Sequence, residues 1–305
     1  MPNLLSLTHR QIIILIPVIR ETHTVPPLPE PIRLSDYAGG VFISLPARKG
    51  MKKAIDRGLV TVNERPAVTA ALLRGGETIA LLADERTAAR PPLELELSVH
   101  YEDDHLAVIS KPAGITVSGN RWRTVTRALP FNLRPSPLPA ALPQPQPAHR
   151  LDHPTSGLLL VGKTATALTA LGRLFAAREI QKTYHAVTAG EMPPSGSFDS
   201  PIDGRPALTE YRVPAVIASV EHSCLNLLRL HPHTGRRHQL RIHLAGAGHP
   251  ILGDREYGTG RVSRTGRGLY LHATELAFRH PVTGEDVRVS EELPTKFRKL
   301  FPDWK

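Results

Sequence analysis

The sequence from residue 149 to residue 161 reads His-Arg-Leu-Asp-His-Pro-Thr-Ser-Gly-Leu-Leu-Leu-Val and joins two unlike pieces. Its first half is a polar turn that carries a single carboxylate, Asp152. Its second half, residues 158–161, is an apolar run typical of a buried strand. A carboxylate placed just before a buried strand is held on a rigid element, which is where a catalytic group is best positioned.

Asp152 also has an ordinary explanation. Asp side chains stabilise turns by accepting hydrogen bonds from nearby backbone N–H groups. Taken alone, a single Asp in a Pro-Thr-Ser-Gly turn therefore favours a turn residue over a catalyst. The rest of the chain has to decide between these two interpretations.

The composition indicates a folded protein with a polyanionic partner. The chain has 305 residues, of which 41% are hydrophobic, so it can bury a core in one large or two ordinary domains. Its formal net charge of +10 favours a partner such as nucleic acid, the alternative being a basic protein without one. Because aromatic residues make up only 5%, any stacking on bases depends on a few rings.

Cysteine usage and hydropathy indicate the compartment. Cys224 is the only cysteine, which excludes an internal disulfide and a cysteine-based zinc site and fits the reducing cytoplasm. The apolar run at 12–16 is too short to span a bilayer and has no small-residue cleavage site. We therefore expect a cytoplasmic protein with no membrane partner, and no obligate protein partner is evident.

Proline and charge patterns divide the chain into three parts. Residues 1–30 end in a proline-rich stretch and are expected to be an N-terminal arm or tail. Residues 31–90 are expected to form a small domain with a linker, and residues 91–305 the main domain. Seven prolines within 119–148 exclude a continuous helix or a central strand, so we expect a loop or flexible insert there.

The small domain is predicted to carry a basic helix over residues 49–57, ended by Gly58. Its cations lie at helical spacing and share one face. A basic face beside the strands predicted at 59–63 and 75–82 is typical of a surface that binds a phosphate backbone, the alternative being an ordinary solvated helix. The cations are Arg48, Lys49, Lys52, Lys53 and Arg57.

A second dense motif, residues 234–244, reads Thr-Gly-Arg-Arg-His-Gln-Leu-Arg-Ile-His-Leu. We expect a turn at Gly235 and then a strand that Leu240 and Ile242 anchor in the core. Histidines here and nearby raise the question of a metal site, but no compact ligand set such as His-Glu-x-x-His is present. No metal is therefore predicted.

Taken in order, these motifs resemble those of the RluA-type pseudouridine synthases. The family's His-Arg-Leu-Asp and Thr-Ser-Gly pattern matches 149–157, and its Thr-Gly-Arg-x-His-Gln-Leu-Arg-x-His pattern matches 234–243. The resemblance runs from about residue 93 to the C-terminus, and residues 31–83 resemble the S4 RNA-binding module. Shorter matches are Lys-Pro-x-Gly at 111–114, Lys-x-Tyr-x-Ala at 182–186 and His-Pro-Ile-Leu-Gly-Asp at 249–254.

The resemblance implies an α+β pseudouridine synthase fold. Such a fold has a mixed, largely antiparallel sheet with flanking helices and a central cleft, here joined to a small α/β S4-like domain. The implied reaction converts a uridine in structured RNA to pseudouridine without a cofactor, with Asp152 acting on a flipped-out uridine. Ribosomal RNA is favoured as the substrate, and transfer RNA is the alternative.

The resemblance also implies roles for single residues. In the family, the tyrosine that matches Tyr184 lies against the target base. The arginine that matches Arg241 pairs with the catalytic Asp, and a cation there favours the ionised carboxylate. Arg150 is expected to fill the space that the extruded base leaves.

Three further cations are candidates for contact with RNA. Arg236 and Arg237 are expected to bind phosphate, and Lys111 lies beside a rigid Pro-Gly turn where it either touches phosphate or is a surface lysine. The rival hypothesis is a non-catalytic RNA-binding or ribosome assembly factor that keeps the fold. A hydrolytic glycosidase is disfavoured because no second carboxylate stands in a comparable motif, and a metal-dependent nuclease because clustered acids are absent.

Overall fold

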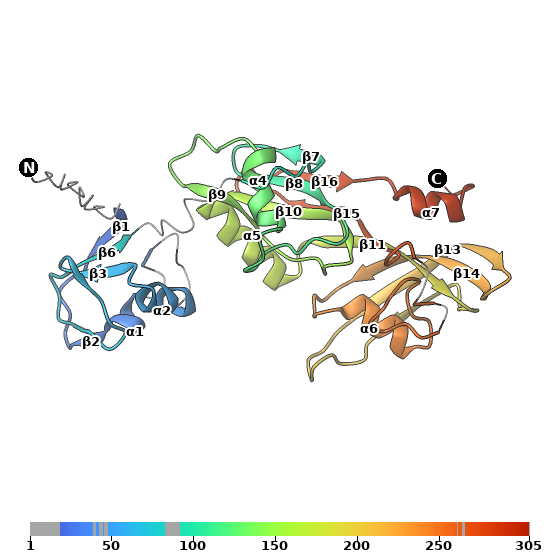
Figure 1. The fold of residues 1–305 in the computed structure, drawn as a ribbon, viewed down its shortest axis with the longest axis horizontal. Coiled ribbons are helices and arrows are strands. Elements are labelled where there is room, and N and C mark those ends of the chain that lie inside the picture. Colours follow the sequence, from blue (N-terminus) through green and yellow to red (C-terminus); the bar gives the residue numbers. More distant parts are fainter. Residues whose placement is uncertain are drawn as a thin grey trace, which may run out of the picture. The chain divides into compact units, whose positions relative to one another are not determined.

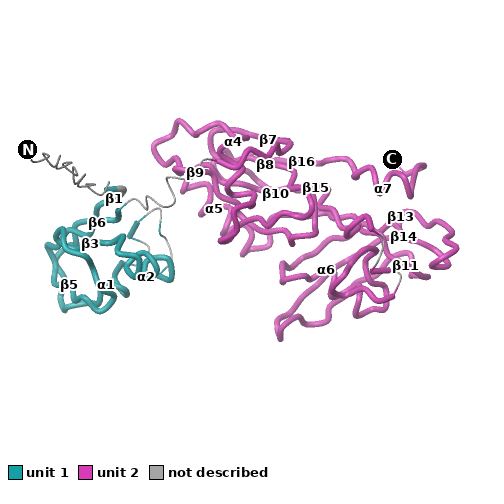
Figure 2. Tube along the Cα trace, viewed as in Figure 1, with its two compact units in different colours: residues 1–91 teal, residues 92–305 magenta. Residues whose placement is uncertain are grey.

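The computed structural model describes residues 19–304 apart from 39–40, 43–44, 46–47, 83–91, 261 and 264–265. The chain divides into two compact units, residues 1–91 and 92–305 (Figure 2). Each unit has a hydrophobic core of its own, as the buried clusters of the two units show.

The described residues of unit 1 form small antiparallel sheets with the short helices α1 and α2 (Figure 1). The order of its main antiparallel sheet is β1-β6-β3-β4, and β2 pairs with β5. The elements are β1 (Ile19–Thr24), β2 (Ile32–Arg33), α1 (Leu34–Tyr37), α2 (Arg48–Asp56), β3 (Val60–Val62), β4 (Arg65–Pro66), β5 (Leu72–Leu73) and β6 (Thr78–Leu82). Residues 19–24, expected to belong to an arm or tail, instead form the edge strand β1, because the prolines begin only at Pro26 and end this strand rather than prevent it.

Helix α2 is amphipathic, as its spacing predicts. Met51, Ala54 and Ile55 are buried in the core of unit 1. The predicted cations from 48 to 57 are all exposed, and Arg48 forms an ion pair with Asp36 of α1. Their contact with RNA remains a prediction.

Unit 2 is built on one large sheet with the strand order β12-β13-β14-β11-β15-β10-β8-β7, to which β16 and β9 are added on β15 and β10. Of the described strand pairs, only β10 and β15 run parallel. The predicted mixed, largely antiparallel fold is therefore confirmed. The strands are β7 (Val99–Glu102), β8 (Leu106–Lys111), β9 (Ala141–Pro147), β10 (Ser156–Thr164), β11 (Gln181–Ala189), β12 (Ser195–Phe198), β13 (Thr209–Ser219), β14 (Ser223–Pro232), β15 (Leu271–Arg279) and β16 (Asp286–Ser290), and the helices are α4 (Val125–Asn132), α5 (Ala165–Ala177), α6 (Gln239–Gly246) and α7 (Thr295–Leu300).

Strand β10 is the central strand of this unit, and both of its faces are covered. Leu158 and Leu160 pack in a cluster with Leu171 of α5, whereas Leu159 and Val161 pack in another with Leu129 of α4. Because both faces are buried, the strand reads as a continuous apolar run rather than as an alternation. This explains the run of residues that follows Asp152.

The proline-rich stretch is more regular than expected. The prediction of a loop or flexible insert was wrong for residues 125–132, which form α4 with the Thr124 hydroxyl as an N-cap, and for residues 141–147, which form β9. Strand β9 accommodates Pro147 because the neighbouring backbone N–H, that of Ala148, points to β10 and donates to Leu160, so position 147 faces the other way. The pairing of β9 with β10 shifts in register between residues 146 and 141.

The motif at 238–244 was predicted to be a strand, and this was wrong, because residues 239–246 form helix α6. Leu240 and Leu244 are both buried and lie four residues apart, which is the helical and not the strand repeat. The Gln239 side chain stabilises the start of the helix by accepting a hydrogen bond from the backbone N–H of Arg236 at 3.0 Å. The alternation of Leu240 and Ile242 was therefore misleading.

Gly157 allows β10 to lie against β15. It has a φ of +115°, and a Cβ atom there would lie 2.3 Å from the carbonyl oxygen of Ala273 on β15. We expect Gly157→Ala to lower the free energy of unfolding by roughly 2–4 kcal/mol, because both the backbone conformation and the strand contact disfavour a side chain. Denaturant unfolding checks this, with Gly172→Ala, a helical position with open space around its Cβ, as the control that should not destabilise.

Candidate active site

The register of the sheet brings distant motifs together. Gly157 on β10 pairs with Ala273 on β15, and Ala273 also pairs with Tyr184 on β11. Tyr184 in turn pairs with Leu230 on β14, whose end leads into α6. The turn that carries Asp152 therefore lies in the same region as Tyr184 and the start of α6, although these residues are far apart in the sequence.

Asp152 lies at the meeting of two cavities of about 490 and 520 Å³, both of which it lines. Its side chain is only 15% exposed. The turn around it is held by backbone hydrogen bonds, from the Thr155 N–H to the Asp152 carbonyl at 3.1 Å and from the Gly114 N–H to the His153 carbonyl at 2.8 Å. The carboxylate is thus fixed at the base of an open cleft.

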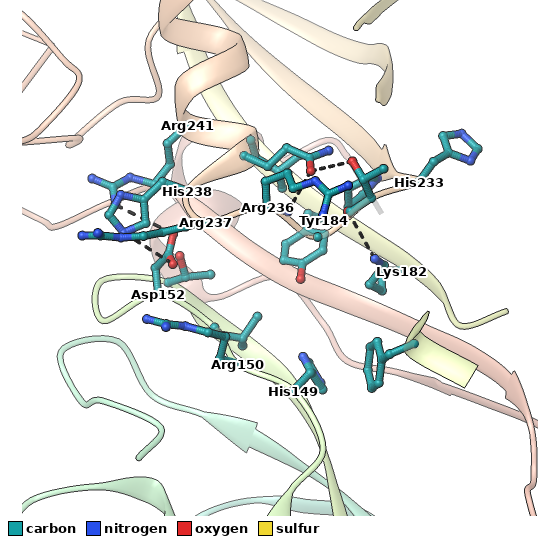
Figure 3. A pocket seen from close by; sticks show the side chains of 18 of the residues that line it. His149, Arg150, Asp152, Lys182, Tyr184, His233, Arg236, Arg237, His238 and Arg241 are labelled. Carbon is teal, nitrogen blue, oxygen red and sulfur yellow. Dashed lines mark hydrogen bonds and ion pairs between the residues drawn. The ribbon is translucent and has the colours of Figure 1, made fainter. Parts of the chain in front are cut away.

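Two cationic or polar side chains from the second motif face Asp152 (Figure 3). Nη1 of Arg241 lies 3.8 Å from Oδ2 of Asp152, and Nε2 of His238 lies 3.6 Å from its Oδ1. The structure therefore brings Asp152 and Arg241 together as the resemblance implied. Their separation is longer than a hydrogen bond, so the interaction is an electrostatic one across a short gap.

Arg241 has a closer partner than Asp152. Its Nε and Nη2 donate hydrogen bonds to the two oxygens of Asp254, each at 2.7 Å, and Nη2 also donates to Glu256 at 3.0 Å. The side chains of Arg241 and Asp254 are 3% and 0% exposed. Asp254 therefore holds the guanidinium in place and leaves Nη1 directed at Asp152.

His238 connects the carboxylate to a second tyrosine. Its Nδ1 lies 2.8 Å from the hydroxyl of Tyr257, and its backbone has a left-handed φ of 55°. Non-glycine residues rarely adopt this conformation, and those that do are concentrated at functional positions. His238 thus orients one side of the Asp152 carboxylate.

Tyr184 is half-buried on β11 and, together with Asp152, lines the cavity of about 490 Å³. Burial raises the pKa of the Tyr184 phenol well above its usual value, and the negative charge of Asp152 raises it further. The phenol therefore stays protonated at physiological pH. It can present its ring or its O–H to a group bound beside Asp152.

Lys111 was predicted to contact RNA phosphate or to lie on the surface, and both interpretations were wrong. The side chain is 0% exposed, and its Nζ donates to the carbonyls of Pro112 and Ile115 at 2.8 and 2.9 Å. A third, longer contact at 3.4 Å reaches the His153 carbonyl, next to Asp152. Burial lowers the pKa of this ammonium to about 8, and the charge of Asp152 partly opposes the shift.

We expect Lys111→Met to destabilise the fold by about 1–3 kcal/mol, because it leaves the carbonyls of Pro112 and Ile115 buried without a donor. Denaturant unfolding measures this loss. Since Lys111 is inaccessible, the salt dependence of RNA binding should not change. If the salt dependence of RNA binding fell clearly in Lys111→Met, the purely structural role would be contradicted. The hypothesis that Lys111 contacts RNA phosphate would then be supported.

The other predicted cations divide between the two units. Arg150 and Arg237 are exposed and line both cavities. Arg236 lines the cavity of about 490 Å³, and its Nε donates to the Pro206 carbonyl at 3.1 Å. The cations of α2 belong to unit 1. Two site residues were missed by the sequence interpretation. Asp254, which positions Arg241, is the last residue of the His-Pro-Ile-Leu-Gly-Asp motif, and this match was the signal that could have identified it. The position of His238 beside Asp152 was also not predicted.

Within the described part of the chain, no group of three or more His, Cys, Asp or Glu side chains is placed to hold a metal ion. None of the described helices is long and apolar enough to cross a membrane.

The fold and the cleft agree with comparisons to known proteins. Residues 105–246, which include Asp152, Tyr184 and Arg241, match the family described as RNA pseudouridylate synthase. The chain belongs to this family, as its motifs predicted, and it is an RNA isomerase. The resemblance of unit 1 to an S4 module remains a prediction.

Two bacterial relatives, both named ribosomal large subunit pseudouridine synthase D, show how far the similarity extends. The protein of Xanthomonas campestris pv. campestris is 38% identical over 260 residues, which is 75% of this chain and 76% of that protein. The protein of Haemophilus influenzae is 34% identical over 287 residues, covering 84% and 86%. Among solved structures, human RNA pseudouridylate synthase domain containing 1 matches with a TM-score of 0.55 and 26% identity over 67% of this chain and 86% of that chain.

Proposed function

We propose that this enzyme converts a uridine of ribosomal RNA in the large subunit to pseudouridine and that Asp152 is its catalytic carboxylate. The observation that supports this most directly is the place of Asp152, which is fixed at the meeting of two cavities between Arg241 and His238. The names of the two bacterial relatives support the large ribosomal subunit as the source of the substrate. The single cysteine supports a cytoplasmic location.

The reaction breaks the N1–C1′ bond of uridine, turns the base and joins C5 to C1′, with loss of the hydrogen on C5 as a proton and gain of a proton at N1. Because neither redox change nor net hydrolysis occurs, the chemistry needs no cofactor. The Arg241 guanidinium lies 3.8 Å from the Asp152 carboxylate and faces the oxygen that would attack the nucleotide or take up a proton. The protonated Tyr184 would lie against the uracil and restrain it while the bond is open.

A uridine in folded RNA has to leave its stack before it reaches the base of the cleft. Extrusion costs a few kcal/mol, and phosphate contacts by exposed cations offset it. Arg150 and Arg237 line both cavities around Asp152 and are placed for this role, with Arg150 filling the space left by the base. The exposed cations of α2 would add backbone contacts from unit 1.

The proposal is tested by the release of tritium from RNA labelled at uridine C5, because joining C5 to C1′ must expel that hydrogen. Unmodified transcripts of large-subunit ribosomal RNA and of transfer RNA are compared. Tritium release from the ribosomal transcript supports the proposal. Release from the transfer RNA transcript alone would show that transfer RNA, and not ribosomal RNA, is the substrate. Tight binding to both transcripts without release from either would favour a non-catalytic assembly factor.

A further inference from the structure

Four lysines of unit 2 are buried or half-buried, and three of them have close partners. Lys111 donates to two carbonyls at 2.8 and 2.9 Å. Lys163 donates to Glu102 at 2.7 Å and to the Asp103 carbonyl at 2.6 Å. Lys296 donates to the Leu269 carbonyl at 2.5 Å and lies 4.6 Å from the centre of the Tyr270 ring.

Lys182 differs from these three. Among the described residues its one hydrogen bond is long, from Nζ to the Thr234 carbonyl at 3.4 Å, and it forms no ion pair with a described carboxylate. Burial lowers the pKa of this ammonium. A half-buried charge with so little compensation has an energetic cost, which proteins usually avoid by pairing the charge.

Lys182 lies in the cleft and not in the core. It is two residues before Tyr184 on β11, so both side chains project from the same face of the strand. Both line the cavity of about 490 Å³, and Figure 3 shows Tyr184 between Asp152 and Lys182. A group held by Lys182 would therefore sit beyond the base that Tyr184 contacts.

The surroundings of Lys182 favour an anion. Asp152 is the only acidic side chain among the residues that line this cavity, whereas the cations that line it are Arg150, Arg178, Lys182, Arg236, Arg237 and Arg241. His149, which faces the same cavity, accepts a hydrogen bond from the Leu160 N–H at 3.0 Å and is neutral, since burial and the charge of Lys182 lower its pKa to about 3. Among the described residues no carboxylate forms an ion pair with Lys182, so an anion that enters the cleft would supply the missing partner.

We propose that Lys182 binds a phosphodiester of the RNA next to the target uridine and so fixes the register of the strand in the cleft. This inference rests on the proposed function, because it takes the ligand of the cleft to be RNA. It assigns to Lys182 a positional role, since a single ammonium recognises phosphate as a point charge and not by base identity.

The test compares Lys182→Met with Lys182→Arg by measuring the affinity for the large-subunit ribosomal transcript over a range of salt concentrations. We expect Lys182→Met to weaken binding on the order of tenfold and to reduce the slope of log K against log salt by about 0.7–0.9, the value of one phosphate contact. Lys182→Arg should keep the slope. Lys296→Met removes another half-buried lysine outside the cleft, and should leave the slope unchanged.

An RNA with one neutral methylphosphonate beside the target uridine identifies the partner of Lys182. If the contact is made there, the methylphosphonate and Lys182→Met weaken binding together no more than either change alone, because both remove the same interaction. The inference would be overturned if the effects of Lys182→Met and of the methylphosphonate on binding free energy were fully additive at each of the two phosphates that flank the uridine. An unchanged salt slope in Lys182→Met would also overturn it. Absence of tritium release with intact RNA binding would instead contradict the proposed function, so the two failures are distinguishable.

Discussion

Asp152→Asn is expected to abolish pseudouridine formation while the fold and RNA binding stay nearly intact. Asn has almost the same shape as Asp but carries no charge, so it can neither attack nor take up a proton. The loss should be on the order of 10⁴-fold or more, as for other residues that act directly on the substrate. Tritium release from the labelled ribosomal transcript measures it.

The control for this variant is its affinity for the same transcript. Asp152 contributes no cation to the phosphate contacts, so the dissociation constant and its salt dependence should match those of the unchanged protein. A far-ultraviolet circular dichroism spectrum checks the fold. Near-normal turnover in Asp152→Asn would show that another group is the catalyst.

Asp254→Ala is expected to have the largest effect on stability. It removes the bidentate partner of Arg241 and leaves that guanidinium buried. The remaining carboxylates near it are Glu256, whose side chain is half-exposed, and Asp152 at 3.8 Å. Removing one member of a buried ion pair costs about 3–5 kcal/mol, which denaturant unfolding can measure. Activity should also fall in the fraction that stays folded, because Arg241 no longer holds its orientation toward Asp152.

The effect of Asp254→Ala should depend on pH. Burial raises the pKa of the Asp254 carboxyl, but the hydrogen bond from Arg241, the backbone N–H groups of Tyr257 and Glu256, and the charge of Arg241 together bring it below its usual value. A lowered pKa in the folded state stabilises the protein above the unfolded value of about 4, and this stabilisation is lost as the pH falls further. The difference in unfolding free energy between the two proteins should therefore shrink below about pH 4. A difference that stays constant down to pH 2 would contradict the ion pair as its source.

The sequence predicted the elements whose pattern is local. The apolar run after Asp152, the basic helix over residues 49–57 and the strand at 75–82 are present as β10, α2 and β6. Their periodicity reports burial directly, so each segment could be interpreted without its neighbours. The motif resemblance supplied the order of these elements and the meeting of Asp152 with Arg241.

The features that the sequence could not provide depend on long-range contacts. Whether the lysine at 111 is exposed or buried follows from how the turn at 112–115 folds over the Asp152 turn, and no spacing encodes that. The helix α6 was hidden because a short alternation of apolar residues fits a strand as well as part of a helix. The role of Asp254 in positioning Arg241 can be recognised only from the structure, which brings the two residues together although they lie thirteen positions apart in the sequence.

The alternating prolines of β9 have a consequence for the behaviour of the molecule in concentrated solution. Residues 143, 145 and 147 have no N–H to donate, and among the described strands β9 pairs only with β10. A strand from a second molecule cannot form a regular ladder on such an edge, so the prolines guard against self-association through sheet extension. Replacing the three prolines with threonine should increase light scattering during storage, while the unfolding midpoint changes little.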